Sequence, residues 1–360
     1  MRQNRAEILG PQEWKEERET RIPPSTVNEP LYQAVDKLLG PKYQPQLVAR
    51  GGEHLVFELR DQVWPRNVVV KVNFNETLPV YKAYDKGDKV KIEMEKIRLD
   101  EKIKSYNRRK AKLKEYFGSS AVPAQLTMVR EIPMNPEIAG KLRSAVFTDS
   151  RTIKAPAWIS VQRRIELDPE KTFSLTGYYL EAISNAIEPE LYDKAHSVLS
   201  QGDNNGYSPE EELDIALEAM EDLDELPAQM ELDPEFKSKL QETARDLIKF
   251  EGETGIILDL AGNNNMVLVQ EKGGWHLKMP DVLFTDDSIA MHSLKSAAER
   301  IRRGEELDFG LALKCYYILN TVRVINALAV ISGIPERLRI KELQDIDPET
   351  WRKNFKQVRF

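Results

Sequence analysis

The stretch Thr254-Gly-Ile-Ile-Leu-Asp-Leu-Ala-Gly-Asn-Asn-Asn-Met-Val-Leu-Val269, followed by Gly273-Gly-Trp-His-Leu-Lys-Met-Pro-Asp-Val-Leu283, decides our interpretation of the fold. An apolar run ends on Asp259, and Asn264 follows five residues later. Two short apolar runs, residues 266–269 and 275–279, flank a Gly-Gly dipeptide, which is typical of a β-hairpin. Because a hairpin returns the chain to its starting end, Asn264 and Asp281 should meet there, with Asp259 in the loop beside them.

Three oxygen-bearing side chains at one end of a hairpin suit Mg²⁺ and a phosphate group, because hard cations take oxygen ligands. The alternative is a polar turn beside a hairpin, for which Asp and Asn are ordinary residues. This stretch alone leaves both interpretations open.

The composition indicates a folded protein large enough for two packed units: 360 residues, 41% of them hydrophobic and 31% charged. A net charge of −7 argues against a general nucleic-acid binder. The start of the chain lacks an apolar signal core, and the lone Cys315 has no partner for an internal disulfide, so we expect a cytoplasmic protein. Polar residues interrupt the apolar stretch 309–334, which therefore predicts a buried helix and no membrane contact.

The first half of the chain predicts a small sheet. Residues 46–59 contain two strand-like runs around Gly51 and Gly52, and residues 67–73 form a third, with Lys71 inside an apolar β-branched run. A buried lysine needs an anionic partner, because an unpaired buried charge is costly. The alternative is a lysine on an edge strand that points to solvent.

A long charged helix is predicted over residues 91–117, after a polar loop at 82–89, and further strands over 124–132 and 157–165. Together these elements make a five-stranded, mostly antiparallel sheet with one helix. Beyond residue 166 the pattern is helical with a single hairpin. Helices are expected over residues 193–199, 209–226, 234–250, 293–303, 309–331 and 348–355.

This order of elements resembles the protein-kinase-like fold: an α+β, bilobal protein with a small antiparallel five-stranded N-lobe, one long helix and a mainly helical C-lobe. The resemblance divides the chain into an N-terminal extension with a short helix (1–43), an N-lobe (44–166) and a C-lobe (167–360). Gly51-Gly-Glu-His-Leu-Val56 looks like the glycine-rich loop and Val68-Val-Val-Lys71 like the Val-Ala-Ile-Lys strand. Asp259-Leu-Ala-Gly-Asn-Asn264 looks like the Asp-Leu-His-Pro-Gly-Asn loop of small-molecule phosphotransferases.

The resemblance implies a nucleotide site for ATP. Gly51 and Gly52 would let the backbone approach the phosphates, Val56 would pack on the base, and Lys71 would bind the α- and β-phosphates. The strand ending in Gln162 and Arg163 would lead into the hinge, where backbone groups meet the adenine.

The resemblance also implies the catalytic and metal-binding residues. Asp259 would be the base or hydroxyl-orienting group, whereas Asn264 and Asp281 would bind Mg²⁺. Asn263 and Asn265 are register alternatives to Asn264. The partner of Lys71 would be Glu101, with Glu95 as the rival.

Several residues depart from the kinase pattern. Ile257-Leu258-Asp259 replaces His-Arg-Asp, Asp281-Val-Leu283 replaces Asp-Phe-Gly, and no Ala-Pro-Glu segment follows. A regulated protein kinase needs that last segment to hold a peptide. The chain therefore looks closer to the compact, atypical bacterial kinase-like proteins and to aminoglycoside phosphotransferases.

Two main hypotheses follow. The first is a phosphotransferase that uses ATP and Mg²⁺ on the hydroxyl of an unknown small molecule or protein. The second is a pseudokinase that regulates or scaffolds a partner without phosphotransfer. A third, weaker one is a two-lobed binding protein unrelated to nucleotides.

Overall fold

The computed structural model describes residues 43–50, 54–61, 68–134, 153–163, 165, 167–178, 188–202, 206–262, 264–343 and 346–355. The chain forms two compact units, the first of Met1–Arg108 with Pro123–Glu166, the second of Arg109–Val122 with Leu167–Phe360. The chain thus crosses between units at residue 166, where the sequence changes character, and also within the long helix, which was not expected. Nearly all of the expected N-terminal extension lies outside the described residues.

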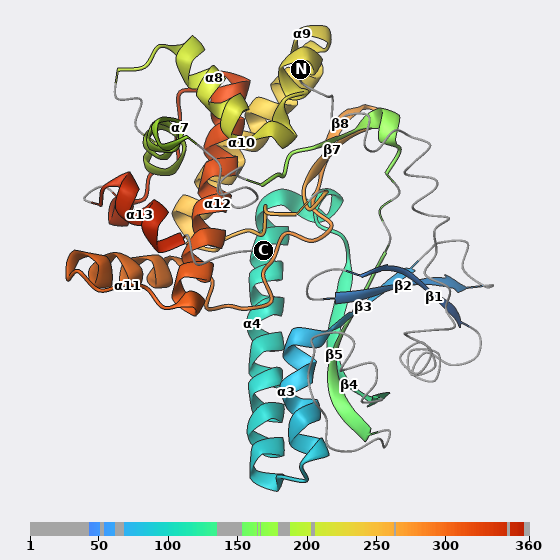
Figure 1. Cartoon of the computed structure of the whole chain (residues 1–360). Helices are drawn as coiled ribbons and strands as arrows, with labels where there is room; N and C mark the ends of the chain where they lie inside the picture. Colours follow the sequence, from blue (N-terminus) through green and yellow to red (C-terminus); the bar gives the residue numbers. More distant parts are fainter. Residues whose placement is uncertain are drawn as a thin grey trace. The chain divides into compact units, whose positions relative to one another are not determined.

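The first unit contains a five-stranded antiparallel sheet in the order β1-β2-β3-β5-β4 (Figure 1). Its strands are β1 (Tyr43–Arg50), β2 (His54–Asp61), β3 (Val68–Asn73), β4 (Gln125–Met134) and β5 (Ile153–Arg163). The expected strands are therefore present. Because β3 pairs on both sides and the Lys71 residue is 7% exposed, the alternative of an edge-strand lysine in solvent is wrong.

Two helices follow β3, where the sequence predicted one. Helix α3 (Phe74–Asp85) starts directly after the strand, and the Asn73 side chain caps it by accepting a hydrogen bond from the Glu76 N–H at 2.9 Å. The prediction missed this helix because Pro79, a residue that usually breaks helices, lies inside it. Helix α4 (Lys89–Ala121) is the expected long helix, with a kink at Gly118, whose φ is +82°.

The sheet face that carries Lys71 is polar and packs against α4. Ser160 of β5 lies opposite Lys71, and its hydroxyl is 3.0 Å from that of Thr127 on β4. The Tyr106 ring of α4 packs edge-on against Trp158, with ring centroids 5.3 Å apart. Thus a residue of the apolar stripe of α4 contacts the sheet face on which Lys71 is buried.

The second unit is mainly helical and holds a three-stranded antiparallel sheet, in the order β6-β7-β8. Strands β7 (Val267–Glu271) and β8 (Gly274–Lys278) are the predicted hairpin. The expectation of a hairpin alone was wrong, because the short β6 (Thr172–Ser174) pairs with β7. The helices are α7 (Pro189–Ala195), α8 (Pro209–Ala219), α9 (Leu226–Leu232), α10 (Pro234–Thr254), α11 (Met291–Arg302), α12 (Phe309–Ser332) and α13 (Pro348–Phe355).

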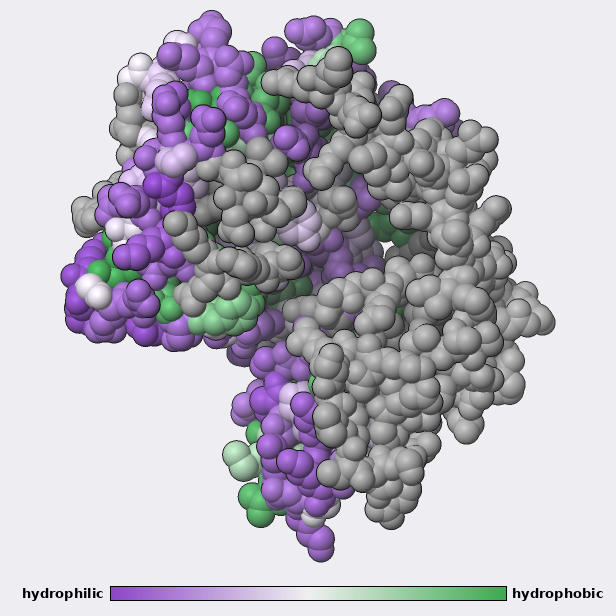
Figure 2. All heavy atoms as spheres, in the orientation of Figure 1, coloured by the Kyte–Doolittle hydropathy of each residue, from purple (hydrophilic) through white to green (hydrophobic). Residues whose placement is uncertain are grey.

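Helix α12 is the core of the second unit. Of the described helices, it alone is long and apolar enough to cross a membrane by length and composition, and 94% of its most apolar window is buried in the protein. Its buried polar residues, among them Arg323 and Asn326, bind neighbouring segments. In contrast, the described atoms on the face shown in Figure 2 are mainly hydrophilic, with small hydrophobic areas between them. The predicted buried helix is therefore confirmed.

Candidate functional site

The segments that carry Asp259 and Asp281 run side by side in the second unit. Helix α10 ends at Thr254 and is capped by Gly255, which adopts a left-handed backbone with φ of +64°, and the chain then turns into the Asp259 segment. Leu258 forms an antiparallel bridge with Leu283, and the Asp259 N–H donates to the Val282 carbonyl at 2.9 Å. Backbone pairing thus joins two segments that lie more than 20 residues apart in the chain.

The β7–β8 hairpin brings Asn264 to the same end as Asp281. Val267 pairs with Lys278 at the open end of the hairpin, so Asn264 and Asp281 each lie three residues beyond it. The sequence predicted this arrangement of positions. The roles of the three side chains in metal binding and catalysis stay predictions.

The structure distinguishes the neighbouring asparagines of the loop. The Asn265 side chain donates to the Asp259 carbonyl at 3.0 Å, so this amide holds the loop together. Asn264 adopts a left-handed backbone with φ of +61°, which asparagine tolerates better than most residues, and its N–H donates to the Ser174 hydroxyl at 3.3 Å. The Asn265 amide is thus engaged within the loop, and Asn263 lies outside the described residues, so the assignment of Asn264 as a metal ligand stays a prediction.

The sequence interpretation missed the segment around Thr176 and Gly177, which forms hydrogen bonds with this loop. The Thr176 hydroxyl donates to the Gly262 carbonyl at 2.6 Å, and the Gly177 N–H donates to the Leu260 carbonyl at 3.3 Å. Polar and apolar residues alternate from Thr172 to Thr176, which is a strand signal that could have revealed β6. Gly177 is needed here because a Cβ atom would lie 2.6 Å from the Cβ of Asp222.

Tyr178 is a further residue near the loop. Its N–H donates to the Asp222 carboxylate at 2.9 Å. Burial raises the pKa of the Tyr178 phenol, and the negative charges of Asp259 and Asp222 raise it further. The phenol therefore stays protonated and lies within the electrostatic range of Asp259.

The three positions near the open end of the hairpin, Asp259, Asn264 and Asp281, carry oxygen-bearing side chains, namely two carboxylates and one amide. This chemistry fits Mg²⁺, which prefers one or two carboxylates together with waters and substrate phosphates. The described residues contain no cluster of three or more His, Cys, Asp or Glu side chains that could hold a metal ion. The Mg²⁺ site therefore stays a prediction, which rests on the oxygen chemistry of Asn264 and Asp281.

In the first unit, β2 and β3 place Val56 directly opposite Lys71. Residues opposite each other on antiparallel strands lie on the same face, so the two side chains are neighbours. Gly51 and Gly52, predicted to form the phosphate loop, lie outside the described residues. The pairing of β2 with β3 therefore places Val56 beside Lys71, whereas the role of both residues in nucleotide binding stays a prediction.

The strand expected to lead into the hinge is β5. Gln162 pairs with Gln125 of β4, and Arg163 continues one residue beyond that last pair. Gln162 is buried, and the chain enters the second unit just after Glu166. The end of β5 thus lies at a passage between units, where the resemblance puts the hinge.

The predicted partner of Lys71 does not fit its surroundings. Glu101 is exposed on α4, which argues against it because the Lys71 side chain is buried. The rival Glu95 binds Arg98 at 2.6 Å. A different buried acid, Glu76 of α3, was not considered in the sequence interpretation, and it pairs with two cations of α4.

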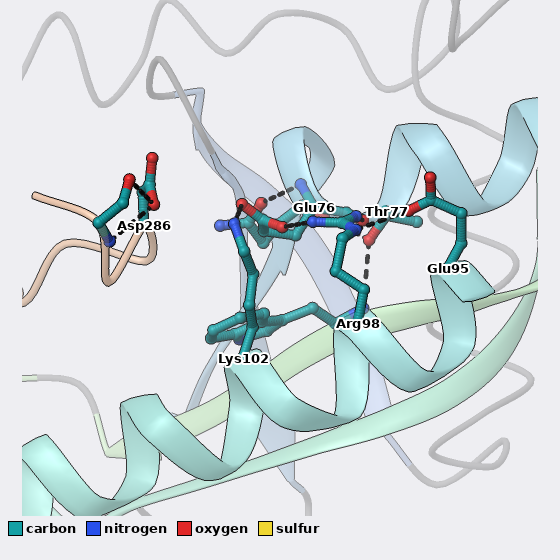
Figure 3. Close-up of polar contacts among 9 residues, drawn as sticks. Glu76, Thr77, Glu95, Arg98, Lys102 and Asp286 are labelled. Carbon is teal, nitrogen blue, oxygen red and sulfur yellow. Dashed lines mark hydrogen bonds and ion pairs between the residues drawn. The ribbon is translucent and has the colours of Figure 1, made fainter. Parts of the chain in front are cut away.

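Glu76 connects α3 to α4 through two cations (Figure 3). Its nearly buried carboxylate forms an ion pair with Arg98 and another with Lys102, the second at 2.7 Å. Arg98 also donates to the Glu76 carbonyl at 3.0 Å. Because Asn73 at the end of β3 caps the same turn, this cluster fixes α4 relative to the strand that carries Lys71.

We expect Glu76→Gln to lower the free energy of unfolding by about 1–2 kcal/mol, because it removes the charge shared by two partly exposed cations. The matched control is Glu93→Gln, which breaks an exposed pair with Lys96 and should cost less than about 0.5 kcal/mol. Urea denaturation of both variants measures the difference. Equal stabilities for the two would show that the cluster does not hold α4.

Comparison with known proteins gives distant structural likenesses. No protein-family model and no curated protein matches the chain. The crystal structure of aminoglycoside phosphotransferase APH(4)-Ia matches 84% of this chain and 98% of its own, with 13% identity and a TM-score of 0.24. A thermostable mutant of that protein, in ternary complex with ADP and hygromycin B, matches 83% of this chain and 98% of its own, with 14% identity and a TM-score of 0.22. Because these values are so low, we base the functional proposal on this chain's own residues.

Proposed function

We propose that this protein is an atypical kinase-like phosphotransferase that uses ATP and Mg²⁺ to phosphorylate a hydroxyl group of an acceptor. The observation that carries the proposal is the backbone pairing of the Asp259 and Asp281 segments, with Asn264 at the same end of the hairpin. This arrangement is the one that the kinase-like resemblance requires of these three positions. Lys71 is buried on β3, a strand that pairs on both sides, at the position where the kinase-like resemblance puts the phosphate-binding lysine.

Each residue has a proposed role in phosphoryl transfer. Asn264 and Asp281 would hold Mg²⁺, which when bound neutralises the charge of the β- and γ-phosphates. Lys71 would bind the α- and β-phosphates. Asp259 would orient the acceptor hydroxyl and take its proton as the oxygen attacks the γ-phosphorus. The bond from that phosphorus to the bridging oxygen of the β-phosphate breaks, and ADP leaves.

A pseudokinase is the second candidate, and a specific feature favours it. Leu258 and Val282, which replace the arginine of His-Arg-Asp and the phenylalanine of Asp-Phe-Gly, are buried and form backbone pairs beside the two acids. The surroundings of the site are therefore apolar where regulated kinases carry a phosphate-reading arginine. A protein with such a loop could retain nucleotide binding and lose turnover.

A thermal-shift titration tests the binding part of the proposal. Mg²⁺ and ATP together should raise the melting temperature of the wild type, because a ligand at a hundredfold excess over its Kd stabilises the folded state by roughly 2.7 kcal/mol. Asp281→Ala should lose this shift. The matched control is Asp287→Ala, which removes an exposed acid nearby and should keep the shift. A wild type that shows no shift would contradict the proposal.

Release of ADP from ATP then separates the two candidates. Asp259→Asn should still bind Mg²⁺ and ATP in the thermal-shift assay but release ADP more slowly than the wild type, because it cannot take the proton of the attacking hydroxyl or water. Wild-type protein that binds the nucleotide without releasing ADP, in the presence of any acceptor offered, would favour the pseudokinase.

A further inference from the structure

Glu251 is a buried acid in the last turn of α10, eight residues before Asp259. The residue is 4% exposed, and one oxygen of its carboxyl group accepts a hydrogen bond from the Leu258 N–H at 3.0 Å. The other oxygen has no hydrogen-bond partner among the described residues. A carboxyl group in such a place is costly, so its presence calls for a reason beyond packing.

The Leu258 peptide that Glu251 holds is the one directly before Asp259. A second buried side chain, Thr321 of α12, donates from its hydroxyl to the Leu258 carbonyl. The backbone of Leu258 is also bridged to Leu283. Side chains from two helices therefore bind both polar groups of this residue, and the orientation of the next residue, Asp259, depends on them.

We propose that Glu251 is a positioning residue of the Asp259 loop, which acts through the Leu258 N–H and touches neither nucleotide nor acceptor. This inference rests on the proposed function, because that function assigns Asp259 to the acceptor hydroxyl. Without the acceptor oxygen of Glu251, the Leu258 N–H would be buried and unpaired. We therefore expect the loop to shift until this N–H forms another hydrogen bond.

The protonation of Glu251 agrees with this role. Burial raises the pKa of the carboxyl group to about 8, and the Leu258 hydrogen bond opposes the rise. No charged side chain of the described residues contributes to the shift. The group is therefore mainly neutral at pH 7, and a glutamine, which is also neutral and offers the same acceptor, should replace it.

The direction of the pH effect follows from linkage. The pKa of Glu251 is higher in the folded state than its ordinary value of 4.5, so the folded state binds this proton more tightly. The resulting stabilisation is complete below pH 4.5 and is lost as the pH rises through about 8. Glu251→Gln should remove this loss, so its melting temperature should exceed that of the wild type increasingly up to about pH 8.

Hydrogen exchange of the free protein tests the positioning directly and needs no activity. Glu251→Met keeps the volume and removes the acceptor, and it should speed exchange of the Leu258 amide by about tenfold or more. Glu251→Gln and the matched control Glu253→Gln, an exposed acid in the same turn, should exchange like the wild type. If the Leu258 amide exchanged at the same rate in Glu251→Met as in the wild type, the proposal would be overturned.

Release of ADP from Mg²⁺ and ATP provides the second readout. Glu251→Met should lower kcat by about tenfold with little change in KM for ATP, and Glu251→Gln should restore it. An equal loss of kcat in Glu251→Met and Glu251→Gln would overturn the proposal, because the glutamine keeps the hydrogen bond to the Leu258 N–H. If the wild type binds no nucleotide, the proposed function fails, and the exchange of Leu258 still decides whether Glu251 positions the loop.

Discussion

Replacing Asn326 with leucine should lower the free energy of unfolding by roughly 3–5 kcal/mol, although the two side chains have similar volumes. Asn326 is fully buried in α12 and binds two other segments through three hydrogen bonds. Its side-chain N–H₂ donates to the Leu199 carbonyl at 2.8 Å and to the Leu338 carbonyl at 3.0 Å. Its oxygen accepts from the Leu338 N–H at 2.7 Å.

The size of the effect comes from the groups that the substitution leaves behind. Leucine can neither donate nor accept, so three buried backbone groups would lose their partner at once. Each such group costs about 1–3 kcal/mol when it is buried without a hydrogen bond. The gain from a more apolar side chain is smaller, because the site already excludes water.

Urea denaturation of Asn326→Leu measures this loss. The matched control is Ser332→Ala in the same helix, since the Ser332 hydroxyl donates to the Ala329 carbonyl, one turn earlier in the helix, at 3.2 Å. That bond is local, so its removal should cost about 1 kcal/mol or less. A leucine variant within about 1 kcal/mol of the wild type would contradict this account, because water would then have to replace the lost partners.

The same helix shows what a sequence pattern can and cannot predict. The mixture of apolar residues with Asn320, Arg323 and Asn326 correctly predicts a helix that is buried inside the protein. It does not identify their partners, which lie in segments remote in the chain, such as Ser200 for Arg323. Periodicity reports which face is buried, whereas the partners of buried polar groups depend on tertiary structure.

In the candidate site, too, the sequence predicts some features and misses others. The hairpin, its Gly-Gly turn and the grouping of Asn264 with Asp281 follow from local signals, because the register of a short hairpin depends on its turn. The support from Thr176 and Gly177 does not, since β6 has three residues and pairs with a strand more than 90 positions away. The alternation from Thr172 to Thr176 indicates a strand, but so short a run does not identify the strand with which it pairs.

The first unit gives a further example, in the partner expected for Lys71. Family spacing indicates Glu101, which the structure leaves exposed, whereas Glu76 is the buried acid at the α3–α4 contact. This acid was overlooked because α3 itself was missed. Glu76 binds Arg98 and Lys102, so the partner of Lys71 stays a prediction.

Replacing Trp275 with alanine should cost roughly 3–5 kcal/mol and loosen the hairpin that carries the candidate site. Trp275 is 6% exposed and packs edge-on against Phe236 of α10 and Phe173 of β6, with ring centroids 4.9 and 5.7 Å apart. Its indole N–H donates to the Asp233 carboxylate at 2.8 Å. That carboxylate caps α10. The Trp275 side chain therefore connects the hairpin to the start of α10, the helix that leads to Asp259.

Two variants separate packing from the hydrogen bond. Trp275→Phe keeps an aromatic ring and loses the bond to a charged group, so it should cost about 1–3 kcal/mol, less than the alanine variant. Hydrogen exchange should then report faster opening of β7 and β8 in Trp275→Ala than in Trp275→Phe, with α12 less affected in both. If the alanine variant were as stable as the phenylalanine variant, the aromatic cluster would not be what holds the hairpin. The candidate metal ligands beyond the open end of the hairpin would then depend on the Leu258–Leu283 bridge instead.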